Sequence, residues 1–250
     1  MTDRVLLNNV DHHDLRVAVR HGAAFGDAVN QLRIFPTEYE EVQRAYPIFF
    51  RQGAETSRIS VALLGLDRDE NLFLGDGGQG GWTADYVPAI QQRGPFSIGM
   101  VRSTHDGVGA GDGVGEAMLH VDLDDPRVGD ETGLPLFLEH GGNTPYLDHV
   151  TGVLRLLYEG METAPAAFTA LDEAGLLAPV TLTIDVSDER RYTVPDVLVV
   201  DLEQLATLSG APLEHLHRSG ILRLAILAAA SLGNIQHLIA RKHQLLAQIG

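Results

Sequence analysis

The chain has 250 residues, of which 44% are hydrophobic, and this length and composition exclude disorder over most of the chain. Its 34 acidic residues outnumber 18 Lys and Arg, and the resulting net charge of −16 disfavours binding to nucleic acid or to an anionic membrane surface. Cysteine is absent, which excludes disulfides, thiolate metal sites and a cysteine nucleophile.

The first hundred residues predict several strands and one short helix. Apolar, β-branched and aromatic runs predict strands over residues 13–20, 48–50, 59–65, 71–74 and 96–101. The helix is expected to start within residues 36–42 and to run to about Tyr46. Thr37 can cap its first turn, Glu40 lies three residues later as the partner of the cap, and Pro47 disfavours helical geometry in the residue before it.

The rest of the chain predicts more helix. A strand over 116–123 and an acidic turn over 124–133 precede two helices, at 147–157 and 166–174. A hairpin of 180–186 and 192–200 follows, and then helices beginning at Asp201 and covering 212–218 and 222–249, the last broken at Gly233-Asn234. Strands and helices without regular βαβ alternation predict an α+β fold, with a mixed or antiparallel sheet in the N-terminal lobe and a helical C-terminal segment.

We expect one domain over residues 1–250, and the glycine-rich segment 107–115 could divide it into a strand-rich lobe, 1–106, and a second lobe, 116–250. No membrane span is expected, because the longest strongly apolar stretch, Leu222–Leu232, is interrupted by Arg223 and is shorter than the ~20 residues that a span needs. The N-terminus lacks a basic segment followed by a long apolar stretch, so we expect no secretory signal and a cytoplasmic location.

Alternate glycines at 109–115 invite comparison with a phosphate-binding loop. Such a loop needs a lysine after its last glycine, and a dinucleotide-binding loop needs a helix after it, whereas a strand is predicted here. The segment is therefore interpreted as a flexible surface loop.

Aromatic residues gather between Tyr46 and Phe96, and their ordinary role is the core of the N-terminal lobe. Trp82 and Tyr86 follow a second glycine-rich loop, 75–81, and each has a polar group that suits the rim of a pocket. Asn71 could supply an amide beside them. Trp82, Tyr86, Asn71 and Tyr46 are the candidate ligand-binding residues, and the ligand would be a small molecule or a peptide.

His120-Val121-Asp122 has the His-x-Asp spacing of a non-haem iron site, which a distant histidine would complete. The alternative is a solvated acidic turn, because Asp122 begins a cluster of carboxylates that continues through Asp124 and Asp125. The spacing does not match a calcium loop. We expect no metal and no cofactor, and keep an iron oxygenase-like enzyme as an alternative function.

Several short blocks, in this order, resemble the bacterial SapC family. They cover His13, Leu15–Val17, Glu38, Tyr46–Phe50, Ala62–Leu66, Glu70–Phe73, Gly81–Trp82, Tyr86–Ala89, Pro95–Phe96, Gly133–Phe137, His217–Leu222 and Ser231–Ile235. The resemblance runs from about residue 5 to about residue 243. One departure is Gln91–Gly94, where the family would have a more basic and aromatic run before Pro95-Phe96.

What the resemblance implies about function is an accessory role. SapC-like proteins are often encoded near tryptophan-halogenase-like flavoproteins and TonB-dependent receptors, which suggests a role in the uptake or modification of a substrate. The family name also implies an association with bacterial surface layers, so a surface-layer structural protein is a further alternative. We therefore expect an accessory protein that binds a small ligand or peptide.

Overall fold

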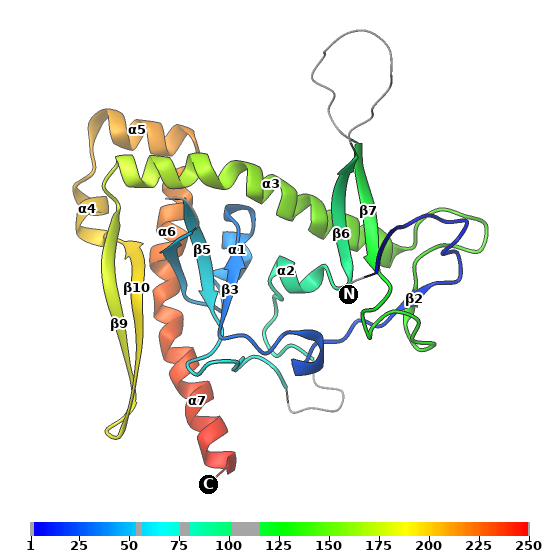
Figure 1. Ribbon diagram of the computed structural model, residues 1–250. Helices are drawn as coiled ribbons and strands as arrows, with labels where there is room; N and C mark the ends of the chain where they lie inside the picture. Colours follow the sequence, from blue (N-terminus) through cyan, green and yellow to red (C-terminus); the bar gives the residue numbers. More distant parts are fainter. Residues whose placement is uncertain (1–2, 54–56, 76–80, 102–115, 250) are drawn as a thin grey trace. The chain divides into compact units, whose positions relative to one another are not determined.

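The computed structural model describes residues 3–53, 57–75, 81–101 and 116–249. The chain forms two compact units, and each unit is built from two segments of the sequence. Unit 1 comprises Met1–Arg20 and Gln91–Arg155, and unit 2 comprises His21–Ile90 and Leu156–Gly250. Both units contain antiparallel strands and helices, which confirms the α+β class (Figure 1). The segment 107–115, where a division into lobes was expected, lies outside the described residues.

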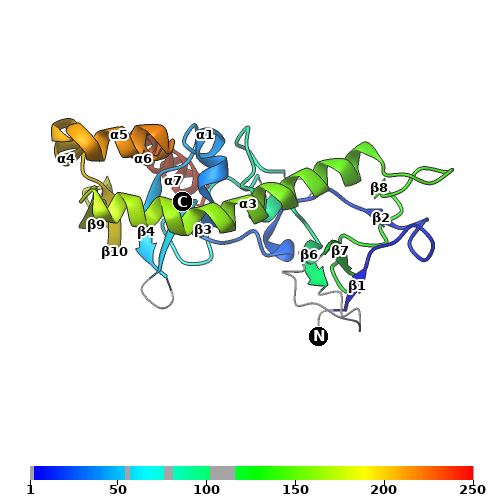
Figure 2. The same ribbon diagram turned by 90° about the horizontal axis from the view of Figure 1, so that it is seen from above.

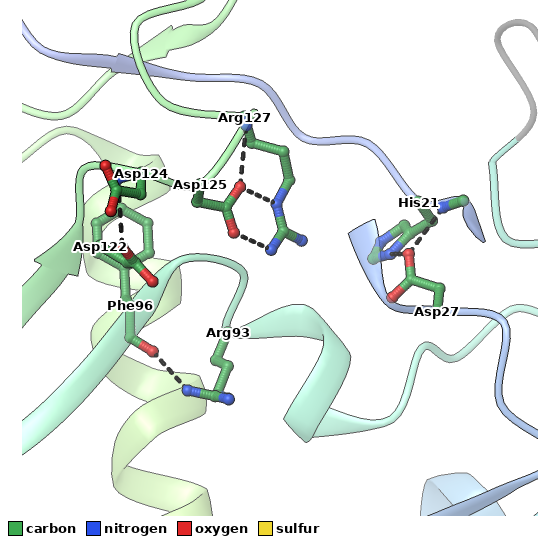
Figure 3. A network of polar contacts seen from close by, with 9 residues as sticks. His21, Asp27, Arg93, Phe96, Asp122, Asp124, Asp125 and Arg127 are labelled. Atoms are coloured by element: carbon green, nitrogen blue, oxygen red, sulfur yellow. Dashed lines mark hydrogen bonds and ion pairs between the residues drawn. The ribbon is translucent and has the colours of Figure 1, made fainter. Parts of the chain in front are cut away.

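Unit 1 contains a three-stranded antiparallel sheet in the order β1 (Arg4–Leu6), β7 (Glu116–Asp122) and β6 (Phe96–Val101). A small pair joins β2 (Arg16–Val17) to β8 (Leu134–Pro135). The strand predicted over 13–20 is thus only two residues long. The acidic turn after β7 is held by a fork of hydrogen bonds from the buried Arg127 to the carboxylate of Asp125 (Figure 3).

Unit 2 is built on a five-stranded antiparallel sheet with the strand order β3-β5-β4-β10-β9. Its strands are β3 (Gln31–Ile34), β4 (Ile48–Gln52), β5 (Arg58–Leu63), β9 (Leu177–Ser187) and β10 (Arg190–Val200). The predicted hairpin is confirmed, and it forms the long pair of strands in Figure 1. The strand predicted over 71–74 was wrong, since only a single bridge joins Leu74 to Trp82.

A single helix, α3 (Pro145–Glu173), replaces the two helices predicted at 147–157 and 166–174 (Figure 2). The separation was predicted wrongly because Pro165 does not end the helix. Pro165 and Met161, whose carbonyl loses its helical donor, both lie on the exposed face, where water can satisfy that carbonyl. The apolar residues on either side of Pro165 share one buried face, from Leu147 to Leu171.

The short helix predicted to start within residues 36–42 and to run to about Tyr46 is present in unit 2, but it ends at Val42 and is capped differently. It consists of a 3-10 turn η2 (Pro36–Glu38) that leads into α1 (Tyr39–Val42). Pro36 occupies the first turn and moves the start toward the N-terminus, because its fixed φ suits that position. Glu38, rather than Glu40, therefore accepts the backbone N–H of the residue before the helix, and Thr37 donates to the carbonyl of Leu156 at 3.0 Å.

The C-terminal residues form α4 (Leu202–Thr207), α5 (Gly210–Arg218), α6 (Ile221–Ser231) and α7 (Ile235–Ile249). The carboxylate of Asp201 caps α4, as the sequence predicts, by accepting the N–H groups of Glu203 and Gln204. The predicted break at 233–234 is a 3-10 turn, η4 (Leu232–Asn234). Ser231 and Asn234 fix this turn to the rest of unit 2, because Ser231 accepts the N–H of Ile48 and Asn234 donates to the carbonyl of Gln43.

By length and composition alone, the helical stretch Ile221–Gln248 could cross a membrane. In the folded protein 33% of its most apolar 18-residue window is buried. Core helices of soluble proteins meet the same criteria, so the expectation that the chain has no membrane span stays a prediction.

Candidate functional site

Three of the four candidate ligand-binding residues lie next to one another in unit 2. The indole Nε1 of Trp82 donates to the hydroxyl of Tyr46 at 2.5 Å, and that hydroxyl donates to the backbone carbonyl of Tyr86 at 2.5 Å. Tyr46 is completely buried, whereas Trp82 and Tyr86 are half-buried. Tyr46 therefore holds the segment that carries the other two rings.

Asn71, the fourth candidate, has a different local role. Its Nδ2 donates to the carbonyl of Asp27 at 2.8 Å, and its Oδ1 accepts the N–H of Phe73 at 3.0 Å. Both ends of the amide are thus engaged by backbone groups. The contacts that the structure gives Asn71 stabilise the turn before Phe73, and ligand binding by this residue stays a prediction.

A buried carboxylate, Glu38, fixes Tyr86 from inside unit 2. The resemblance to the family includes this residue, but the sequence assigned it no role. Glu38 is 2% exposed, and its Oε2 accepts the hydroxyl of Tyr86 and the N–H of Ala89, both at 2.9 Å. Its Oε1 accepts the N–H of Phe35 at 3.1 Å. Burial raises the pKa of Glu38, and the three donors oppose that rise. Burial and the neighbouring Glu38 also raise the pKa of Tyr86, so its hydroxyl remains a donor.

Tyr86 forms part of the wall of an open groove with a volume of about 540 Å³. The groove lies among the end of α1, the segment that follows Trp82, and one face of α7, with Phe73 between them. Its lining residues are Glu41, Arg44, Ala45, Phe73, Thr83, Ala84, Asp85, Tyr86, His237, Ala240, Arg241 and Gln244. Trp82, Tyr46 and Asn71 are not among the described residues that line it. We call it the Arg241 groove, after the arginine of α7 that lines it.

Arg241 is held in a defined position in this groove. Its guanidinium carbon lies 4.4 Å from the centre of the Phe73 ring, which is a cation–π contact. Its Nη1 donates to Thr83 Oγ1 at 2.8 Å and to the carbonyl of Leu72 at 3.3 Å. Thr83 is fixed in turn, because its hydroxyl donates to the carbonyl of Phe73 at 2.9 Å.

The charges in the groove are unevenly paired. Arg44, which follows α1, forms an ion pair at 3.2 Å with Glu41 of α1, and both side chains are exposed. Lys242, adjacent to Arg241 on α7, forms ion pairs outside the groove with Asp67, at 2.6 Å, and with Glu70. Within the described part of the chain, no carboxylate lies within 4.0 Å of the Arg241 guanidinium.

The spacing of His237 and Arg241 was a signal that sequence reasoning missed. Residues 237, 240, 241 and 244 recur at the intervals that place side chains on one helical face. That pattern could have identified a polar face on α7. It could not have shown that the face lies beside Thr83 and Tyr86, more than 150 residues earlier in the chain.

A comparison with protein-family models places most of this chain in one family. The model named SapC matches residues 7–238 of the 250. The chain belongs to the SapC family. The resemblance derived from the short sequence blocks is therefore confirmed. Comparisons of this SapC-family protein with curated proteins and with solved structures find no significant match.

A second polar cluster of this SapC-family protein lies beside Trp82. The ring of His21 meets the indole of Trp82 edge-on, with 5.7 Å between the ring centres. The His21 Nδ1 lies 3.4 Å from the carboxylate of Asp27, which is completely buried and accepts the N–H of Gly22 at 2.7 Å (Figure 3). The imidazole thus lies beside the Asp27 carboxylate without a hydrogen bond from Nδ1 to any described residue, and the pair contributes to the packing around Trp82.

The candidate iron ligands, His120 and Asp122, lie in unit 1 on the same strand, β7. His120 Nδ1 is 3.2 Å from the carbonyl oxygen of Met118, and the imidazole packs against Gly99, where a Cβ would come within 2.5 Å of the ring. Asp122 accepts the N–H of Asp124 at 3.2 Å (Figure 3). Across the described residues, no three His, Asp or Glu side chains come together as a metal site would need.

We predict that this SapC-family protein, purified without chelator, carries no stoichiometric iron or zinc. A His-x-Asp pair without a third ligand supplies too few donors for a facial triad, and the Met118 carbonyl occupies one nitrogen of the histidine. Elemental analysis of the wild type and of the His120→Ala variant provides the measurement. About one iron per chain, lost in the variant, would contradict this prediction and support the oxygenase alternative.

Proposed function

We propose that this SapC-family protein is an accessory binding protein that holds a small molecule or the end of a peptide in the Arg241 groove. The observation that carries the proposal is that two buried residues hold Tyr86, which forms part of the groove wall. Glu38 fixes the side chain of Tyr86, and Tyr46 fixes its backbone carbonyl. A wall held by buried partners is formed before a ligand arrives, which lowers the entropic cost of binding.

The size and chemistry of the groove suit this proposal. A volume of about 540 Å³ lies within the range of small-ligand sites, roughly 300–1,000 Å³. Apolar surface from Ala45, Ala84 and Ala240 alternates with charged and hydroxyl groups, and such a lining can bury the body of a ligand while orienting its polar end. A second hollow, of about 440 Å³ along α5, is less suitable, because its Arg218 is already paired with Glu214.

The experiment compares the wild type with a variant in which the groove is filled. Ala240→Phe places a ring on an exposed position of α7 that lines the groove, and Ala230→Phe places the same ring on an exposed position of α6 outside its lining. A fragment library would be screened by ¹H–¹⁵N NMR, with thermal unfolding monitored through Trp82, the single tryptophan.

We expect some fragments to shift the amide signals of residues 83–86 and 237–241 in the wild type and in Ala230→Phe. The same fragments should leave these signals unchanged in Ala240→Phe, while both variants unfold close to the wild-type temperature. The proposal fails if no fragment affects these signals, or if Ala240→Phe binds the fragments as the wild type does.

A further inference from the structure

We infer that the ligand of the Arg241 groove carries a carboxylate, and that Arg241 binds it through the edge formed by Nε and Nη2. This inference rests on the proposed function, because it names the chemical class of ligand for the same groove. It depends on the hydrogen-bonding capacity of the guanidinium, the distribution of charge in the chain and the acidic residues of the groove.

The hydrogen bonds of Arg241 leave one complete edge of its guanidinium for a ligand. A guanidinium has five N–H donors, two of them on Nη1. The two on Nη1 are directed to Thr83 and to the carbonyl of Leu72. The donors on Nε and Nη2 have no acceptor among the residues that the structure describes. These two nitrogens form the planar edge that binds a carboxylate through two parallel hydrogen bonds.

Contact with Phe73 holds the guanidinium in place, so this edge is suitable for recognition. An arginine without such a contact would be a freely moving surface charge. The ring lies 4.4 Å from the guanidinium carbon, and the bonds from Nη1 fix the rotation of the group in its plane. The orientation of Nε and Nη2 is therefore defined before binding. An exposed arginine without such contacts would lose much more side-chain entropy on binding a carboxylate.

The charge balance of the chain adds an independent argument. Acidic residues outnumber Lys and Arg 34 to 18, so most cations can find an acidic partner. The neighbouring cations do so, since Lys242 pairs with Asp67 and Glu70, and Arg44 pairs with Glu41. Arg241 has no such partner within the described residues, although it lines a groove with Glu41 and Asp85. An anion from outside the chain would neutralise it.

The acidic groups of the groove favour a carboxylate over a phosphate. Glu41 and Asp85 both line the groove, and the whole chain has a net charge of −16. A doubly charged phosphate would experience this repulsion about twice as strongly as a singly charged carboxylate. One planar edge on one arginine also matches the two oxygens of one carboxylate. The apolar part of the ligand would lie along Ala45, Ala84 and Ala240.

The test uses matched pairs of small probes and two substitutions of Arg241. The probes are propanoate, benzoate and 3-phenylpropanoate, each compared with its uncharged carboxamide, and phenyl phosphate serves as the phosphate probe. Arg241→Gln removes the charge, and Arg241→Lys keeps the charge but removes the planar edge. Arg68→Gln is the control, because Arg68 is 93% exposed and does not line the groove. Dissociation constants are measured by NMR titration of residues 83–86.

We expect at least one carboxylate to bind tenfold or more tightly than its carboxamide, and more tightly than phenyl phosphate. The preference for the carboxylate should fall below threefold in both Arg241 variants and remain unchanged in Arg68→Gln. If carboxamides bind as well as carboxylates, if phenyl phosphate binds better, or if the preference survives in Arg241→Gln, the inference is overturned while the binding function stands. If neither these probes nor any library fragment affects the groove, the proposed function itself fails.

Arg241→Gln could also disturb the fold, because Arg241 covers Phe73. Thr83→Val provides a second variant that leaves Arg241 in place. It removes the hydroxyl that accepts from Nη1 and so releases the orientation of the guanidinium. The preference is the ratio of the dissociation constants of the carboxamide and the carboxylate. We expect Thr83→Val to reduce the logarithm of this ratio by about half or more. An unchanged preference in this variant would overturn the view that the hydrogen bond to Thr83 fixes the orientation of the Arg241 guanidinium before binding.

Discussion

Replacing Glu38 with methionine should lower the free energy of unfolding by about 3–5 kcal/mol, because each buried donor left without an acceptor costs about 1–3 kcal/mol and a half-buried donor costs less. These donors are the N–H groups of Phe35 and Ala89 and the hydroxyl of Tyr86. Methionine has a similar volume, so packing is largely kept and the loss measures the missing acceptors. The same variant should lose ligand binding in the Arg241 groove, because Glu38 positions the side chain of Tyr86.

Glu40→Met is the matched control for this prediction. Glu40 belongs to the same short helix, but its side chain is half-exposed and pairs with Arg223 at the surface. Exposed ion pairs contribute about 0–1 kcal/mol, so this substitution should change the free energy of unfolding by less than about 1 kcal/mol. Urea unfolding of both variants is the measurement. Equal losses in the two variants would contradict the role assigned to Glu38.

Glu38 should also make stability depend on pH, with a sign that its raised pKa determines. The folded state binds a proton at Glu38 more tightly than the unfolded state, so stability falls as the pH rises from the ordinary value of 4.5 through the folded pKa. Glu38→Gln lacks this titration. The difference in unfolding free energy between the wild type and Glu38→Gln should therefore be largest and constant below about pH 4.5 and decrease as the pH rises above it. A difference that grows with pH would show that the three donors, rather than burial, dominate.

Lys242→Met is expected to cost about 3 kcal/mol, the lower end of the range for breaking a buried ion pair. The Lys242 side chain is 4% exposed, and removing its charge leaves the carboxylate of Glu70, 13% exposed, without its cation. Asp67 is 56% exposed, so water can solvate it and moderate the loss. Glu70 Oε2 also accepts the N–H groups of Leu66 and Asp67, which keeps the side chain in place in the variant.

The double variant Lys242→Met/Glu70→Gln separates two contributions to the loss of stability. One is the lost attraction between Lys242 and Glu70, and the other is the cost of a buried Glu70 carboxylate without a cation. Glutamine can keep accepting the two backbone N–H groups while removing the uncompensated carboxylate. The double variant should therefore recover a large part of the loss seen in Lys242→Met. Arg218→Met, which breaks a surface pair with Glu214, should cost less than about 1 kcal/mol. If the double variant is less stable than Lys242→Met, burial of Glu70 is not the cause of the loss.

Local patterns in the sequence predicted the elements whose signals lie within a few residues. Alternation along 180–186 and 192–200 identified the β9-β10 hairpin, and Asp201 identified the cap of α4. The continuity of α3 could not be predicted in this way. Whether Pro165 ends or merely interrupts a helix depends on whether the carbonyl it frees reaches water, and that is a property of the folded surface.

The same distinction applies to the candidate site. Tyr86 and its aromatic neighbours were found because they lie close together in the sequence. Arg241 was not found, and Glu38 entered only through the family resemblance and without a role, because each acts on the segment around Tyr86 from a distant part of the chain. A buried Glu38 has no signature in a single sequence that separates it from the exposed Glu40 two residues later. Long-range contacts of this kind emerge only when the chain is folded.

Lys242 also gives the protein an internal chemical reporter. It is the sole lysine of the chain, and its amine is enclosed by Asp67 and Glu70 in the folded state. An amine-reactive reagent should reach that amine when its contacts with Asp67 and Glu70 break. The rate of acylation at Lys242 would thus report how often these contacts open, and a ligand that holds α7 against the opposite wall of the groove should slow it.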